Sequence, residues 1–223
     1  MVDVLKNFSL QDASISNYVS ELLLDDDPAL EEVRERSSAA DLPGIQLTRE
    51  DTRHLAFLLN ACRAKNVLEI GTLGGYSGLC IARELPADGH LYTVDIEPKH
   101  VAVATETFEK YGYAKQVTCI EAPGLEGFAQ VAAKGKLDFI FLDADRDHYP
   151  EYLELAAEAL RPGGLLVADN TFAYGRIASP PADEEEAALI NGCIQFNKAI
   201  LEHPDFVSTI LPTGEGLTVG ARR

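Results

Sequence analysis

The sequence has few basic residues, since 19 Lys and Arg stand against 36 Asp and Glu, for a formal net charge of −17. Binding to a phosphate backbone needs a basic patch, and no local basic stripe offsets this balance. Cysteine is scarce too, because the four cysteines form no Cys-x-x-Cys pair and have no nearby His to complete a zinc set. We therefore expect no nucleic-acid partner, and we expect the thiols to be reduced and mostly buried.

Long apolar runs are also missing from the sequence. No stretch approaches the roughly 20 residues that a membrane helix needs. Nothing near the N-terminus has the pattern of a secretory signal peptide. These absences predict a cytoplasmic protein with no membrane partner. The chain of 223 residues contains no internal repeat and no linker-like tract, so we expect a single domain that spans residues 1–223.

Short apolar runs alternate with amphipathic stretches in the middle of the chain. The runs are nearly continuous in apolar residues, as expected for strands that are buried on both faces. Such alternation predicts a doubly wound, Rossmann-like α/β fold with right-handed crossovers. The expected strands are residues 66–70, 90–95, 116–121, 137–143 and 164–169, and the expected helices are residues 77–85, 98–111, 125–134 and 149–160.

The two ends of the chain follow a different pattern. Residues 1–50 are expected to be helical with a break at 42–44, and residues 161–164 (Arg-Pro-Gly-Gly) are expected to end a helix in a turn. A helix at 184–201 precedes two apolar runs that predict a terminal antiparallel hairpin, at 206–211 and 216–221. The sheet would then be seven-stranded and mostly parallel. We expect residues 1–45, together with the loop at 171–183, to cover the substrate site.

Each of the five expected parallel strands ends on or beside an acidic residue. Ligands of open α/β sheets bind outside the carboxyl ends of the strands. The acids therefore line one edge of the sheet, where carboxylates can hold hydroxyls, an amine or a metal ion. They are Glu69, Asp95, Glu121, Asp143 and Asp169.

A glycine-rich turn follows the first expected strand. It lacks the G-x-G-x-x-G pattern of dinucleotide sites, because Leu73 and Tyr76 stand where two of the glycines are needed. The free N–H groups of the next helix can receive a carboxylate, and acids nearby can hold an ammonium and ribose hydroxyls. These are the groups of S-adenosylmethionine. The expected cofactor contacts are Glu69, Gly71, Gly75, Tyr76, Ser77, Asp95, Ile96, Ala122 and Asp143.

Polar residues at the ends of the fourth and fifth strands form a third constellation. Adjacent strand ends can bring Asp143, Asp169 and Asn170 into one coordination sphere. Two carboxylates and an amide carbonyl are hard oxygen ligands, which suit Mg²⁺, or another divalent cation such as Mn²⁺ or Ca²⁺. These three residues are therefore candidate metal ligands and candidate catalytic residues.

These motifs together resemble the cation-dependent catechol and caffeoyl-coenzyme A O-methyltransferases, a class I methyltransferase family. Residues 69–77 resemble the cofactor loop of that family, residues 138–145 and 163–171 its two metal motifs, and residues 211–216 its terminal hairpin. The resemblance implies a homodimeric enzyme that transfers a methyl group from S-adenosylmethionine to a catechol-like or vicinally oxygenated small molecule. The metal would hold two adjacent acceptor oxygens and lower the pKa of one hydroxyl.

Two positions depart from the family pattern. The family commonly has a Lys general base where this chain has Arg146, and a guanidinium cannot act as a base near neutral pH. We expect the metal alone to acidify the acceptor while Arg146 orients it or stabilises its anion. His148 is an alternative base, although we favour a solvent-facing role for it. Ala173 stands where members often have a Trp, so Phe172 or Tyr174 is expected to replace that aromatic wall or to pack in the core.

Three alternatives remain open from the sequence. The acceptor could be a non-aromatic or carrier-bound hydroxylated intermediate of secondary metabolism. A protein that binds S-adenosylmethionine without turning it over is kept open by Arg146. An NAD-dependent oxidoreductase is disfavoured by the glycine pattern.

Overall fold

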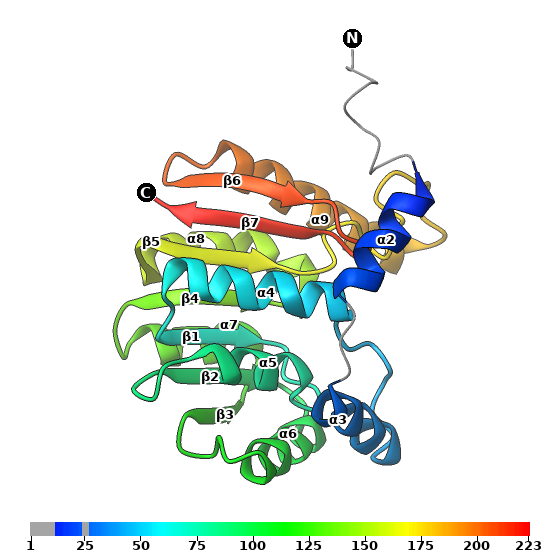
Figure 1. The fold of residues 1–223 in the computed structure, drawn as a ribbon. Helices are drawn as coiled ribbons and strands as arrows, with labels where there is room; N and C mark the ends of the chain where they lie inside the picture. The colour runs from blue at the N-terminus through cyan, green and yellow to red at the C-terminus, as the bar shows by residue number, and fades with distance from the viewer. Residues whose placement is uncertain (1–11, 24–26) are drawn as a thin grey trace.

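A seven-stranded sheet forms the centre of the computed structural model, which describes residues 12–23 and 27–223 (Figure 1). The order is β3-β2-β1-β4-β5-β7-β6; β1 to β5 are parallel, and β7 runs antiparallel to both β5 and β6. The predicted doubly wound fold with a terminal antiparallel hairpin is confirmed. The strands are β1 (Asn66–Ile70), β2 (His90–Asp95), β3 (Val117–Glu121), β4 (Leu137–Leu142), β5 (Leu160–Ala168), β6 (Phe206–Leu211) and β7 (Leu217–Arg222).

Helices cover both faces of the sheet (Figure 1). Those on one face are α4 (Arg49–Cys62), α5 (Tyr76–Glu84) and α6 (Pro98–Lys110). Those on the other face are α7 (Gly124–Ala132), α8 (Tyr149–Ala159) and α9 (Glu184–Glu202). Within the described part of the chain, no helix combines the length and apolar character that crossing a membrane requires.

The central strand β4 shows why the sheet is buried on both faces. Phe139 and Phe141 join the apolar layer under α4 and α5, whereas Ile140 and Leu142 join the layer under α7 and α8, and all four are fully buried. Burial of each such side chain contributes about 1.5–3 kcal/mol relative to exposure. This packing fixes the end of β4, and therefore the position of Asp143, which follows directly.

The N-terminal part is helical, as predicted, where the structure describes it. The helices α2 (Ala13–Leu23) and α3 (Pro28–Ala39) precede the predicted break at residues 42–44, while residues 1–11 and 24–26 lie outside the described part. The expected helical region stopped at residue 50, but α4 continues to Cys62. Its start carried a recognisable signal, because Oγ1 of Thr48 accepts a hydrogen bond from the backbone N–H of Asp51 at 3.1 Å, as in a helix capping box.

The segment at residues 161–164 corrects one prediction. It was expected to form a turn that ends a helix, yet α8 ends at Ala159 and these residues belong to β5, whose register against β4 shifts between Leu137 and Phe139. The side chain of Arg161 donates hydrogen bonds to the Asp138 carboxylate and the Cys62 carbonyl, which hold the segment alongside β4. The positive φ of Gly163 (76°) permits the irregularity in the strand.

Candidate active site

A cavity of about 210 Å³ lies at the carboxyl ends of β1, β2 and β4. Most predicted cofactor contacts line it, but Glu69, Gly75 and Ala122 do not. The predicted residues in its lining are Gly71, Tyr76, Ser77, Asp95, Ile96 and Asp143. Residues that the sequence reading had not assigned also line it, namely Ile45, Gln46, Leu47, Thr72, Leu73, Glu97, His100 and Ala144.

The glycine turn brings two strand ends into close contact. Gly71 has a φ of +104°, and a Cβ at this position would lie 2.8 Å from the backbone oxygen of Asp143. Its N–H donates to the carbonyl of Val94 at 2.9 Å. Only glycine satisfies both the backbone angle and the space, so the turn holds the ends of β1, β2 and β4 around the cavity.

Glu69 lies beneath the turn and is fully buried. Burial raises the pKa of its carboxyl to about 7, against the lowering effect of hydrogen bonds from Ser77 and Thr93. The Thr93 hydroxyl donates to Oε2 at 2.6 Å, while Oε1 is buried without a hydrogen-bond partner among the described residues. A cationic group placed nearby would stabilise the carboxylate form, as expected for the ammonium of an amino-acid cofactor.

Asp95 ends β2 and faces the glycine turn. Its Oδ2 accepts hydrogen bonds from the backbone N–H groups of Thr72 at 3.1 Å and Leu73 at 2.9 Å. Its Oδ1 accepts from the N–H of Glu97 at 3.0 Å. The carboxylate is thus fixed in orientation at the wall of the cavity, where it can accept a hydroxyl donor from a ligand.

Two carboxylates meet at the ends of β4 and β5: Asp169 is buried, and the side chain of Asp143 is 19% exposed. Burial, opposed by Arg146, raises the pKa of Asp143 to about 7. Burial and the neighbouring Asp143 raise the pKa of Asp169 to about 8, and Oδ1 of Asp169 is buried without a partner in the described structure. A pair of acids with an unpaired oxygen is electrostatically suited to a divalent cation.

The amide of Asn170 is the third predicted ligand. Asn170 follows Asp169 directly and has a backbone φ of +54°. Its side-chain oxygen Oδ1 accepts a hydrogen bond from the N–H of Tyr174 at 2.8 Å. Among residues 12–23 and 27–223, no group of three or more His, Cys, Asp or Glu side chains is arranged to hold a metal. A cation here would therefore depend on two carboxylates and this amide oxygen, with remaining positions for water or substrate.

Arg146 begins the short 3₁₀ helix η2 (Arg146–His148) and closes one side of the acid pair. Its side chain is 14% exposed and lies 3.2 Å from Oδ1 of Asp143, with the guanidinium carbon 5.1 Å from the centre of the Tyr174 ring. Burial acts to lower its pKa, but Tyr149 and Asp143 outweigh it and raise the pKa. The side chain therefore stays positively charged beside the acids and is available to an anion.

The other aromatic and basic candidates lie at different depths. Ala173 is buried against Ile190 and Cys193 of α9, so its position does not form a wall. Tyr174 is 51% exposed and faces Arg146, which places an aromatic ring beside the acid pair. His148 is 45% exposed, with Nδ1 3.5 Å from the carboxylate of Asp147. The ring of the other candidate, Phe172, packs against Gly216. Tyr174 is therefore the better placed substitute for the missing aromatic wall.

Two further acids influence the pair, and the sequence reading assigned neither to the site. Glu215, in the connection between β6 and β7, raises the pKa of Asp143, and its backbone oxygen accepts a hydrogen bond from Phe172 at 3.2 Å. Asp51, at the start of α4, is fully buried and contributes to the raised pKa of Asp169. The terminal hairpin motif was a signal for Glu215, whereas Asp51 lay outside every recognised motif.

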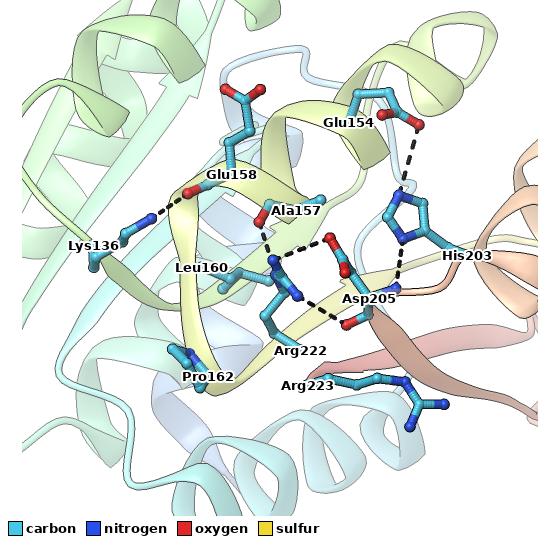
Figure 2. Close-up of a pocket in the computed structure, with 10 residues that line it drawn as sticks. All are labelled: Lys136, Glu154, Ala157, Glu158, Leu160, Pro162, His203, Asp205, Arg222 and Arg223. Carbon is cyan, nitrogen blue, oxygen red and sulfur yellow. Dashed lines mark hydrogen bonds and ion pairs between the residues drawn. The ribbon is translucent and has the colours of Figure 1, made fainter.

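A larger cavity, of about 640 Å³, lies at the opposite edge of the sheet (Figure 2). Several of its charged side chains bond to the protein itself: Arg222 contacts the Asp205 carboxylate at 3.1 Å and the Ala157 carbonyl at 2.8 Å, and His203 lies 3.8 Å from Glu154. These bonds connect the terminal hairpin to α8. We therefore assign this cavity a structural role between the hairpin and α8, and we place the candidate active site at the carboxyl ends of the strands.

The fold and the carboxyl-edge site together define a Rossmann-like methyltransferase. The O-methyltransferase family model matches residues 19–223. The catechol O-methyltransferase of Niastella koreensis is 34% identical over 200 residues, which cover 89% of each chain. Caffeoyl-CoA O-methyltransferase 2 of Petunia hybrida is 31% identical over 201 residues, which cover 86% of this chain and 83% of the relative.

A solved structure gives the same assignment. The O-methyltransferase of Bacillus cereus, in complex with SAH (S-adenosylhomocysteine), superposes with a TM-score of 0.83 and 30% identity, covering 94% of this chain and 97% of that one. The chain belongs to the O-methyltransferase family. The predicted family and the predicted enzyme class, a methyltransferase dependent on S-adenosylmethionine, are confirmed.

Proposed function

We propose that this enzyme methylates a hydroxyl of a small molecule that carries two adjacent oxygens, and that it requires a divalent cation, Mg²⁺ or another such as Mn²⁺ or Ca²⁺. One observation carries the proposal. Asp143 lines the cofactor cavity and also forms the acid pair with Asp169. A single carboxylate would therefore belong to both the methyl-donor site and the cation site, so that the two substrates would meet beside it.

The residues present fit a divalent cation, and Asp143, Asp169 and Asn170 would hold it. When bound, the cation supplies Lewis acidity that lowers the pKa of an acceptor hydroxyl. The protein contributes the position of the acids, which β4 and β5 fix, and the exclusion of water by burial. Ser77 and Glu69 would hold the amino-acid end of S-adenosylmethionine, and Asp95 its ribose.

Arg146 would hold the acceptor as an anion. The acceptor oxygen loses its proton to solvent, because the guanidinium cannot accept one. When bound, S-adenosylmethionine would supply the methyl group: the acceptor oxygen would form the new O–C bond as the C–S bond breaks, and the sulfur would leave as the neutral thioether of S-adenosylhomocysteine. Tyr174, whose ring lies beside Arg146, would bound the acceptor on the same side.

The relatives support this class of acceptor, since their names specify catechol and caffeoyl-CoA as methyl acceptors. A non-aromatic or carrier-bound hydroxylated acceptor is the alternative. The homodimer and the cytoplasmic location remain predictions. Cover of the acceptor by residues 1–45 also remains a prediction, and residues 1–11 and 24–26 of that segment are outside the described part.

The acceptor proposal is tested with matched benzenediols. We expect turnover of the 1,2-diol in the presence of Mg²⁺, and at least about 100-fold lower kcat/KM for the 1,3-diol, whose oxygens cannot both reach one cation. Product formation is measured by mass spectrometry with S-adenosylmethionine as donor. Equal turnover of both diols would contradict the requirement for adjacent oxygens. Cofactor binding without product from any acceptor would instead favour a binding protein.

The cation site predicts a pH-dependent stabilisation. Because the pKa values of Asp143 and Asp169 are raised to about 7 and about 8, both acids hold protons near pH 5.5, and a cation must displace them. The same shifts make the metal-free protein lose stability as pH rises from about 4 to about 8, because the folded state keeps protons that the unfolded state has already released. Mg²⁺ is therefore expected to raise Tm more near pH 8.5 than near pH 5.5, as measured by scanning fluorimetry. Equal increases at both pH values would contradict the site.

A further inference from the structure

His100 lines the cofactor cavity and contacts the acid that is expected to hold the ribose. It lies in the first turn of α6, and its Nδ1 is 3.1 Å from Oδ1 and 3.2 Å from Oδ2 of Asp95. The nitrogen thus stands in front of the carboxylate, almost equally far from the two oxygens. A ribose hydroxyl that donates to this carboxylate would approach through the same space.

The acceptor sites of Asp95 are nearly filled. A carboxylate offers about four lone-pair positions, two on each oxygen. The backbone N–H groups of Thr72 and Leu73 occupy both positions on Oδ2, and that of Glu97 occupies one on Oδ1. One lone-pair position on Oδ1 is left, and Nδ1 of His100 occupies it. The backbone donors belong to a strand-end turn and a helix start, so only the His100 side chain can leave without a change in the main chain.

The size of the cavity supports the same conclusion. At about 210 Å³ it is smaller than the roughly 300–1,000 Å³ of most small-molecule sites. The side chain of His100 is 21% exposed, so it has a path outward to solvent. Rotation of this side chain would both enlarge the cavity and free the last acceptor position on Asp95.

We propose that His100 is a latch on the ribose-holding carboxylate: it satisfies Asp95 in the free enzyme and a ribose hydroxyl displaces it when the cofactor binds. The proposal rests on the predicted ribose contact of Asp95 in the cofactor site. A latch lowers the affinity for every ligand that carries the ribose diol, including the product S-adenosylhomocysteine. Its return to Asp95 would therefore promote product release.

Calorimetric titration with S-adenosylhomocysteine and with its 2′,3′-dideoxy analogue tests the latch. His100→Ala is expected to bind S-adenosylhomocysteine about 10-fold more tightly than the wild type, because no charge-assisted hydrogen bond has to break first. The gain for the dideoxy analogue should be clearly smaller, because that analogue needs the space that His100 leaves but not the acceptor position on Asp95. The matched control is His90→Ala, at the other end of β2, where Nε2 of His90 lies 2.8 Å from the Thr118 hydroxyl; its affinities should equal those of the wild type.

Weaker or unchanged binding by His100→Ala would overturn the latch, as would an equal gain in affinity for the dideoxy analogue. A second measurement needs no variant: the imidazole ¹⁵N signals of His100 in the wild type should shift when S-adenosylhomocysteine is added. Unchanged signals in the saturated complex would also overturn it. If the wild type binds no S-adenosylhomocysteine at all, the cofactor site itself fails, which is a different result.

Discussion

Asp169→Asn is expected to abolish metal-dependent turnover, with kcat/KM reduced at least about 1,000-fold, while the metal-free protein becomes more stable. The rate loss follows because one of the two carboxylates that would hold the cation is removed. A bound cation that lowers the activation free energy by about 4 kcal/mol accelerates the reaction by about three orders of magnitude. The gain in stability, about 1 kcal/mol near pH 8, follows because the two acids no longer repel each other. Steady-state kinetics and thermal unfolding measure the two effects.

The matched control is Asp138→Asn, the same substitution at the opposite end of the β4 region. Asp138 accepts hydrogen bonds from the N–H groups of Lys65 at 2.9 Å and Asn66 at 2.7 Å and pairs with Arg161. Its pKa is lowered by these bonds, against the effect of burial. This variant should lose stability and keep its turnover. If Asp169→Asn kept full metal-dependent activity, the acid pair would not be the cation site.

Arg146→Lys is expected to change the pH dependence of the reaction. The wild type has an arginine that stays protonated, so its rate should follow ionisation of the acceptor and rise with pH. A lysine ammonium can lose its proton and act as a general base, which typically contributes about 10²-fold or more. For an acceptor with a high pKa, we expect kcat/KM of Arg146→Lys near pH 7 to exceed that of the wild type by about 10-fold or more. The pH–rate profile should also become flatter.

Two further variants define the role of this position. Arg146→Ala should lower kcat/KM about 10-fold, because it removes the positively charged guanidinium beside Asp143. It should leave the shape of the pH–rate profile unchanged. His148→Ala should leave both the profile and the rate unchanged if His148 is a solvent-facing residue. A profile of Arg146→Lys parallel to that of the wild type would show that protonation at this position does not limit the reaction.

The sequence was informative where one physical pattern determined the structure. Continuous apolar runs bounded by acids predicted β1 to β4 to within one residue at each end, but only the second half of β5. The signal is clearest in β1 and β4, because a strand buried on both faces permits few other compositions. The common carboxyl edge then followed from the parallel order, and it correctly predicted that Asp143 and Asp169 lie next to each other. The glycine turn could also be predicted from the sequence. The structure explains why Gly71 is a glycine: its backbone angle and a close contact exclude a side chain.

Features that depend on tertiary contacts were not readable from the sequence. Residues 161–164 contain helix-stop and turn residues, yet hydrogen bonds of Arg161 to Asp138 and Cys62 hold them in β5. The pattern around Asp51 marks a helix start and not a site, and His100 stands in an amphipathic helix with no distinctive pattern. Only the packing of α4 and α6 brings these two residues to the site. Pairwise contacts between helix and strand ends therefore determine the details of the site that composition and spacing leave open.

The most direct test of the account is methyl transfer to a 1,2-benzenediol before and after removal of divalent cations with EDTA. We predict that turnover falls at least about 1,000-fold in EDTA and returns when excess Mg²⁺ is added, while S-adenosylhomocysteine still binds throughout. Turnover that survives complete chelation would contradict the account, because Asp143, Asp169 and Asn170 would then not be ligands of a catalytic metal.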